Sequence, residues 1–134
     1  MKNKKILVVE DNDLNMKLVR SLLTRDGYDI VEAKDAESGI QLAHEHYPDL
    51  ILMDIQLPGM DGLSATRAIN SDDDLKKIPI VALTSYAMQE DKEKTLEAGC
   101  VGHLCKPLDT RTFSETISQF IKQDIALNTS QDEI

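Results

Sequence analysis

The sequence predicts a doubly wound α/β fold, in which a parallel sheet of five strands in the order 2-1-3-4-5 is covered by five helices. Continuous apolar runs such as Ile6–Val9 and Leu50–Met53 are typical of strands that are buried on both faces of a parallel sheet. Segments of helical periodicity alternate with these runs, which indicates helices on both faces. Right-handed crossovers restrict the possible topologies. The common arrangement of five strands has a crevice between the first and third strands.

Turn and capping residues mark the first two helices. Asn12 or Asp13 is expected to cap the first helix and Gly27 to close it. A second strand is expected at 28–33, after which Asp35 caps the second helix. Each helix has an apolar face. The predicted faces are Leu14, Leu18, Val19, Leu22 and Leu23 on the first helix, and Ala36, Ile40, Ala43 and Tyr47 on the second.

The third strand is expected to end at Asp54, with a Pro-Gly turn directly after it. Asp61 should cap a helix that runs to Asn70, and residues 71–74 read as a solvated acidic loop. A fourth strand is expected at 78–83 and ends in Thr84-Ser85.

The last third of the chain is expected to hold two helices and a strand. A helix over 87–98 has a thin apolar stripe, mainly Met88 and Leu96, and is therefore predicted to be the least firmly held. The fifth strand is expected at 101–104. A final helix should begin near Thr110, with its buried face formed by Phe113, Ile117, Phe120 and Ile121.

Length and charge restrict the kind of protein. The 134 residues suit one domain, expected over 1–123, with 124–134 as a polar C-terminal tail or the end of the last helix. A net charge of −9 disfavours binding to nucleic acid. No apolar run approaches a membrane span or a signal-peptide core, and Cys100 and Cys105 lack a metal or disulfide spacing. A cytoplasmic protein is expected.

Polar residues follow four of the predicted strands. Glu10 and Asp11 come after the first, Asp54 ends the third, Thr84 follows the fourth and Lys106 the fifth. Carboxyl ends of parallel strands meet at one edge, so these side chains should converge there. Clustered carboxylates need a cation, and hard oxygen ligands favour Mg²⁺, with Mn²⁺ as a substitute.

In this interpretation Asp54 is a nucleophile that forms an acyl phosphate, although as a single residue it could equally be a turn former. Lys106 and Thr84 would contact the phosphoryl oxygens. The backbone carbonyl of Gln56 would be a further metal ligand, beside Glu10, Asp11 and Asp54.

The pattern Glu10-Asp11, Asp54, Thr84 and Lys106-Pro107 resembles the receiver domain of two-component response regulators, the CheY-like superfamily. The stretches Val9–Met16 and Leu52–Pro58 resemble stand-alone cell-cycle regulators of the DivK kind, and receivers attached to hybrid histidine kinases are similar. The resemblance implies that Asp54 accepts phosphate from a phosphohistidine of a histidine kinase or histidine phosphotransfer protein. It also implies a phosphoacceptor protein rather than an enzyme with an external substrate, one that promotes its own phosphorylation and slow dephosphorylation.

The resemblance further implies a cis peptide bond between Lys106 and Pro107, and a switch in which Thr84 moves toward the phosphate. The aromatic switch position of the family holds His103 here, which is either a working switch residue or an ordinary strand histidine. Gln56 and Tyr86 occupy positions that tune the phosphate lifetime in the family, although Tyr86 could equally pack on the helix surface.

The expected output surface consists of helix 87–98, strand 101–104 and the last helix, read by a downstream protein. The alternative is a docking module that ignores phosphate. A haloacid-dehalogenase-type phosphatase would need an acid where Gln56 stands, a flavodoxin would not tolerate the carboxylates at 10–13, and the P-loop motif is missing. His44 and His46 are expected to be solvated, without carboxylate neighbours.

Overall fold

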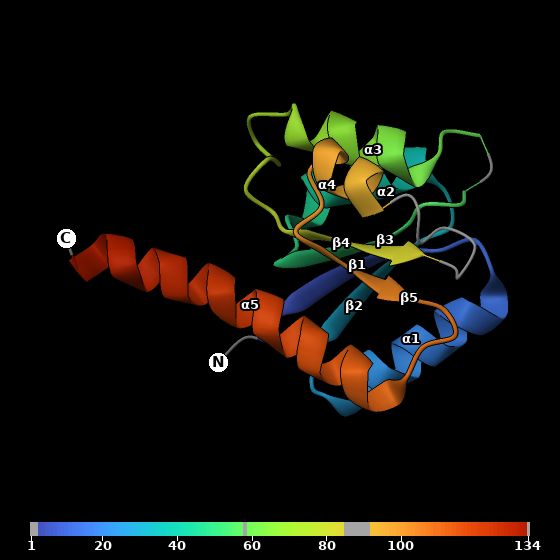
Figure 1. The fold of residues 1–134 in the computed structure, drawn as a ribbon, viewed down its shortest axis with the longest axis horizontal. Helices are drawn as coiled ribbons and strands as arrows, with labels where there is room; N and C mark the ends of the chain where they lie inside the picture. Colours follow the sequence, from blue (N-terminus) through green and yellow to red (C-terminus); the bar gives the residue numbers. More distant parts are fainter. Residues whose placement is uncertain (1–2, 58, 85–91, 134) are drawn as a thin grey trace.

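The computed structural model describes residues 3–57, 59–84 and 92–133, and for residue 92 and residues 122–133 it describes the backbone alone. The strands are β1 (Lys5–Val9), β2 (Asp29–Ala33), β3 (Leu50–Asp54), β4 (Ile80–Thr84) and β5 (Gly102–Cys105). The helices are α1 (Asp13–Arg25), α2 (Ala36–His46), α3 (Gly62–Asn70), α4 (Lys92–Ala98) and α5 (Thr110–Glu133). All neighbouring strands are parallel, in the order β2-β1-β3-β4-β5, which confirms the predicted topology (Figure 1).

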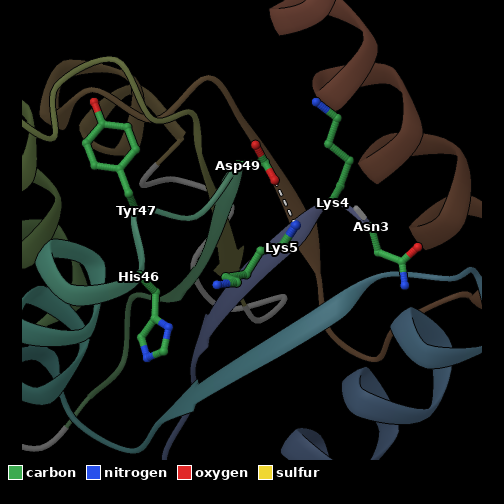
Figure 2. A pocket seen from close by; sticks show the side chains of 6 residues that line it. All are labelled: Asn3, Lys4, Lys5, His46, Tyr47 and Asp49. Carbon is green, nitrogen blue, oxygen red and sulfur yellow. Dashed lines mark hydrogen bonds between the residues drawn. The ribbon is translucent and has the colours of Figure 1, made fainter. Parts of the chain in front are cut away.

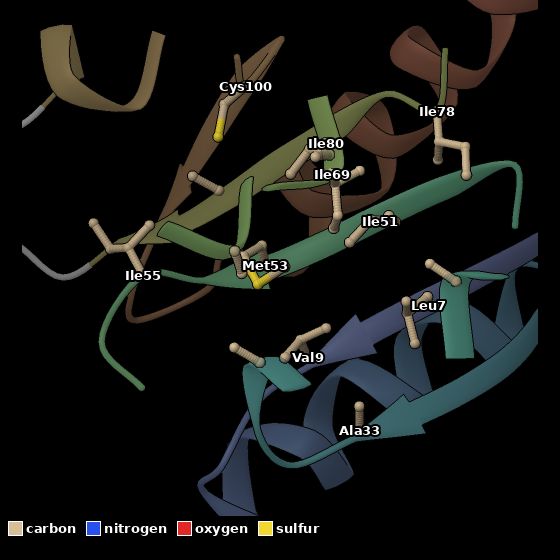
Figure 3. Close-up of a cluster of buried hydrophobic side chains, with 14 of the residues drawn as sticks. Leu7, Val9, Ala33, Ile51, Met53, Ile55, Ile69, Ile78, Ile80 and Cys100 are labelled. Carbon is tan, nitrogen blue, oxygen red and sulfur yellow. The ribbon is translucent and has the colours of Figure 1, made fainter. Parts of the chain in front are cut away.

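Helices cover both faces of the sheet. In Figure 1, α2, α3 and α4 lie on one side, and α1 and α5 lie on the other. Alternate residues of one strand therefore enter different cores: Leu7 and Val9 of β1 belong to the α2–α3 core shown in Figure 3, whereas Ile6 and Val8 belong to the α1–α5 core. This two-sided burial explains why the strands read as continuous apolar runs.

The predicted helix caps are confirmed. The side chains of Asp35 and Asp61 each accept a hydrogen bond of 2.7 Å from the backbone N–H three residues later. Of the two candidates for α1, Asn12 is the cap, because its side chain accepts from the N–H of Asn15 at 2.9 Å. Gly27, at a φ of 88°, follows the end of α1 in the left-handed conformation expected of such a residue.

The predicted faces of α1 and α2 are partly wrong. Leu14 is 79% exposed and Leu18 is also exposed, whereas Met16 is buried with Val19, Leu22 and Leu23. At 3.6 residues per turn, Leu14 lies about 180° around the helix from Leu23, so both cannot face the sheet. On α2, Ala36 and Ala43 are buried as predicted and Ile40 packs against them from a partly buried position.

Tyr47 does not belong to the apolar face of α2. The helix ends at His46, and Tyr47 is 53% exposed in a left-handed conformation with a φ of 46°. The chain turns here to enter β3, which removes Tyr47 from the helical stripe.

The last helices depart from prediction in different ways. Residues 87–91 of the expected helix, with Met88, lie outside the described residues. Leu96 of α4 is 60% exposed, so its assignment to a buried stripe is wrong, and Thr95 and Ala98 are the buried residues instead. On α5, Phe113, Ile117 and Ile121 are buried and Phe120 is partly buried, as predicted. The helix continues to Glu133 and extends beyond the sheet in Figure 1.

Strand boundaries shift by one or two residues from the predicted ones: β4 begins at Ile80, two residues later than predicted, and β5 begins at Gly102, one residue later. β5 and β2 are the two edges of the sheet. β5 is four residues long, and the ring of Phe120 on α5 fills the space where a side chain at Gly102 would stand. Within the described part of the chain, no helix is long and apolar enough to cross a membrane.

Candidate functional site

Three carboxylates meet at the carboxyl edge of the sheet. Asp54 is the last residue of β3 and is 3% exposed. Glu10 follows β1, is fully buried, and donates its N–H to the carbonyl of Ala33 at 3.0 Å. Asp11 beside it is exposed. Ligand oxygens of Glu10, Asp11 and Asp54 lie within 4.8 Å of one another, so the structure brings together the three acids expected from the sequence.

Lys106 lies against two of these acids. Its Nζ is 2.8 Å from Oε1 of Glu10 and 3.1 Å from Oδ2 of Asp54. The backbone N–H of Lys106 also donates to the carbonyl of Thr84 at 2.6 Å, which ties the loop after β5 to the end of β4. The peptide bond between Lys106 and Pro107 is cis.

The carboxylates of the site outnumber the ammonium group that lies against them. Burial, together with the neighbouring Asp54, raises the pKa of Glu10 to about 7 despite the contact with Lys106. For Lys106, burial would lower the pKa, but the hydrogen bonds and charges of Glu10 and Asp54 outweigh it and raise the pKa. The second carboxylate oxygen of Glu10, Oε2, is buried and has no hydrogen-bond partner among the residues that the structure describes. One ammonium therefore does not satisfy this cluster.

The donor set fits a hard divalent cation. Every side-chain ligand from Glu10, Asp11 and Asp54 is a carboxylate oxygen, which Mg²⁺ prefers to nitrogen or sulfur. Oε2 of Glu10, which no described residue binds, and the exposed side chain of Asp11 are both available as ligands to a cation that keeps bound water. Gln56 is near: its backbone N–H donates to Oδ1 of Asp54 at 2.9 Å.

Thr84 and His103, two further residues predicted for the site, lie on the neighbouring strands β4 and β5. Thr84 is buried, and its hydroxyl faces β5, 3.5 Å from the carbonyl oxygen of Leu104 and 3.6 Å from Sγ of Cys105. His103 is half-buried on β5, opposite Ala82 of β4, and lines a cavity of about 300 Å³ between β5 and α5. Tyr86 lies outside the described residues.

The prediction for His44 is wrong in one respect. Its Nε2 lies 3.0 Å from Oδ2 of Asp72, so the histidine has the carboxylate neighbour that sequence spacing did not reveal. Asp72 belongs to the acidic loop after α3, and its side chain also accepts the N–H of Asp74 at 2.8 Å. The loop is folded against α2 because α2 and α3 pack side by side. His46 is exposed, as predicted.

Gly62 supports the site and was not singled out from the sequence. A Cβ at this position would meet the carbonyl oxygen of Asp54 and lie 2.6 Å from Cα of Ile55, so α3 approaches the β3 backbone closer than a side chain permits. The signal was the second glycine of Pro58-Gly-Met-Asp-Gly62, three residues beyond a glycine that already explained the turn.

An acidic cluster of this kind at the carboxyl edge of a 2-1-3-4-5 parallel sheet defines the CheY-like class of signalling domain. Residues 6–118 match the family described as the response regulator receiver domain. The chain therefore belongs to the receiver domain family of two-component signalling.

The similarity of this chain to individual proteins agrees with its assignment to this family. The polar-differentiation response regulator DivK of Brucella anthropi is 43% identical over 118 residues, which cover 88% of this chain and 96% of DivK. The solved receiver domain of the Pseudomonas aeruginosa sensor histidine kinase PA1611, which has a magnesium ion in its active site cleft, is 35% identical with a TM-score of 0.83, over 90% of this chain and 99% of that one. Vibrio cholerae CheY4 is 27% identical with a TM-score of 0.83, over 89% and 99% of the two chains.

Proposed function

We propose that this protein is a DivK-like response regulator that accepts a phosphoryl group from a phosphohistidine onto Asp54 in a Mg²⁺-dependent reaction. Its phosphorylated form would then bind a downstream protein. The observation that carries the proposal is the placement of Lys106 within 3.1 Å of Asp54, next to a Glu10 oxygen that no described residue binds. The chain also spans nearly the whole length of DivK.

In the proposed reaction an oxygen of Asp54 attacks the phosphorus of the donor. A P–O bond forms as the P–N bond to the donor imidazole breaks, and the bonding pair leaves with the imidazole nitrogen. Lys106 would exchange its contact with Asp54 for a phosphoryl oxygen, since its Nζ already lies 3.1 Å from that carboxylate. Glu10, Asp11, Asp54 and the carbonyl of Gln56 would hold Mg²⁺, which supplies positive charge against the phosphoryl oxygens; Mn²⁺ would substitute.

Without a divalent cation, the acidic residues around Asp54 would oppose the reaction. Glu10 and Asp54 share the crevice, and an incoming phosphoryl group brings further negative charge. Lys106 is shared between two carboxylates, as its 2.8 and 3.1 Å contacts show. The requirement for a divalent cation follows from this imbalance.

The phosphate donor would approach over α1. Leu14 and Leu18, four residues apart, are exposed on the first turns after the loop that carries Glu10 and Asp11. Such an apolar helix face beside a phosphoacceptor fits a helix of a histidine kinase or histidine phosphotransfer protein. The downstream partner would use α4, β5 and α5, and a cytoplasmic location is part of the proposal.

The switch would link Asp54 to that output face. Thr84 would turn its hydroxyl from the Leu104 carbonyl toward the phosphoryl group, and His103 would change its position beside the β5–α5 cavity. Gln56 and Tyr86 would tune the phosphate lifetime by shielding it from water. A dephosphorylation rate that is unchanged in Tyr86→Ala would refute the part assigned to Tyr86.

Intact-protein mass spectrometry after acetyl phosphate treatment tests the phosphoacceptor function. One phosphoryl adduct is expected in the wild type with Mg²⁺, and none with EDTA or in Asp54→Asn. Asp61→Asn, which alters a carboxylate that caps α3 instead, is the matched control and should still be labelled. Absence of any adduct on a folded wild type would favour the docking module that ignores phosphate.

A further inference from the structure

A second pocket lies at the opposite end of the sheet from Asp54. It is a cavity of about 300 Å³ formed where the chain enters β1 and β3 and where α2 ends (Figure 2). Its lining residues are Asn3, Lys4, Lys5, His46, Tyr47 and Asp49. β1 is five residues long and thus spans about 17 Å, so the pocket is separate from the acidic crevice.

The pocket has the opposite charge to the rest of the protein. The chain carries a net charge of −9, but two lysines and a histidine line this cavity against one carboxylate. That carboxylate, on Asp49, is engaged by the strand: its Oδ2 accepts the backbone N–H of Lys5 at 2.8 Å, and the N–H of Asp49 donates to the Lys5 carbonyl at 2.7 Å. Figure 2 shows the Lys5 side chain directed away from Asp49, on the side of His46. The cavity therefore suits an anion.

Tyr47 adds an aromatic surface at the pocket. Its backbone is left-handed, with a φ of 46° and a ψ of 65°, a conformation that a tyrosine rarely adopts. The N–H of Tyr47 donates to the carbonyl of Ala43 at 2.9 Å, and 53% of the residue is exposed. Glycine or asparagine would close the helix with less strain, and strained residues concentrate at functional sites. An exposed ring at a pocket lined by lysines is suited to stacking on a planar base.

We propose that this pocket binds a nucleoside phosphate, with the phosphate at Lys5 and His46 and the base against Tyr47. Occupation would hold the amino ends of β1 and β3 together, the two strands whose carboxyl ends bear Glu10 and Asp54. The site uses neither Asp54 nor a metal ion. The proposed binding therefore does not depend on phosphorylation.

Two-dimensional NMR of ¹⁵N-labelled full-length protein, in EDTA at low salt, tests the proposal. AMP is the probe, and inorganic phosphate is the comparison. AMP should shift the amide signals around residues 3–5 and 46–49, bind at least about tenfold more tightly than phosphate, and weaken as salt is added. Asp54→Asn should leave the titration unchanged.

Two pairs of variants decide the result. Lys5→Gln should weaken AMP binding about tenfold, whereas Lys76→Gln, the same charge change on an exposed lysine paired with Asp73, should have little effect. Tyr47→Phe should retain affinity and Tyr47→Asn, which tolerates the same backbone, should lose it. Equal affinity for AMP and phosphate, equal loss in both lysine variants, or shifts centred on the acidic crevice would each overturn the proposal.

Discussion

The burial of Glu10 predicts that the metal-free protein loses stability as the pH rises from 5 to 8. Glu10 is fully buried, and its pKa rises from 4.5 to about 7 because of burial and the nearby Asp54. A group with a raised pKa in the folded state contributes its full stability below 4.5, and this contribution is lost as the pH rises through about 7. At about 1.4 kcal/mol for each tenfold change in proton affinity, the loss is worth about 3 kcal/mol.

Glu10→Gln removes this titration while keeping the size of the side chain. In EDTA the variant should be about 2–3 kcal/mol more stable than the wild type at pH 8 and nearly equal to it at pH 5. Urea unfolding at several pH values measures both, and the difference between the two proteins cancels the titration of the histidines. If the free energies of unfolding of the wild type and of Glu10→Gln changed in parallel between pH 5 and pH 8, Glu10 would not be the group that titrates. The raised pKa assigned to Glu10 would then be wrong.

Four further predictions follow from packing and exposure. Phe113→Ala should destabilise the protein by about 3–5 kcal/mol in urea unfolding, because the ring is fully buried between α5 and the sheet; a loss below about 1 kcal/mol would contradict this packing. Gly62→Ala should cost about 1–3 kcal/mol and reduce acetyl phosphate labelling, because its Cβ would press on the Asp54 backbone; Gly39→Ala, which meets only the side chain of Val9, should cost less. Tyr47→Asn should raise the thermal midpoint through a gain of about 0.5–1 kcal/mol as backbone strain is relieved, and a lower midpoint would contradict the strain. Leu14→Glu should slow phosphotransfer from a phosphohistidine protein about tenfold without changing labelling by acetyl phosphate, and equal slowing of both would place its effect in the crevice instead.

The fold and the edge cluster could be predicted because both depend on local pattern and topology. Leu50–Met53 reads as a buried strand with no knowledge of its neighbours, and a polar residue directly after such a strand must lie at the carboxyl edge. The same rule predicted that Lys106 and Glu10, 96 residues apart, would lie at one edge, and in the structure their side chains are in contact. Capping by Asp35 and Asp61 was equally local, since each cap is closed by an N–H three residues along.

Features that depend on how two elements pack could not be predicted. Leu14 is as apolar as Leu23, and the two lie on opposite sides of α1, so the helical repeat shows that both cannot be buried; which one is buried depends on the rotation of α1 against the sheet. The pair of His44 and Asp72 joins α2 to a loop 28 residues later, and no sequence spacing encodes it. Tyr47 reads as the next step of a helical stripe, because the residue at which a helix ends is set by a backbone turn that periodicity does not report.

The short edges of the sheet have a consequence for how partners recognise this protein. β5 offers only four residues, one of them a glycine beneath Phe120, and β2 offers five. Neither edge therefore presents a long row of backbone groups that an extended peptide or a second sheet could extend by hydrogen bonding. Partners must instead read side chains on helices and loops, so a recognition motif for this protein is to be sought among amphipathic helices and not among extended peptides.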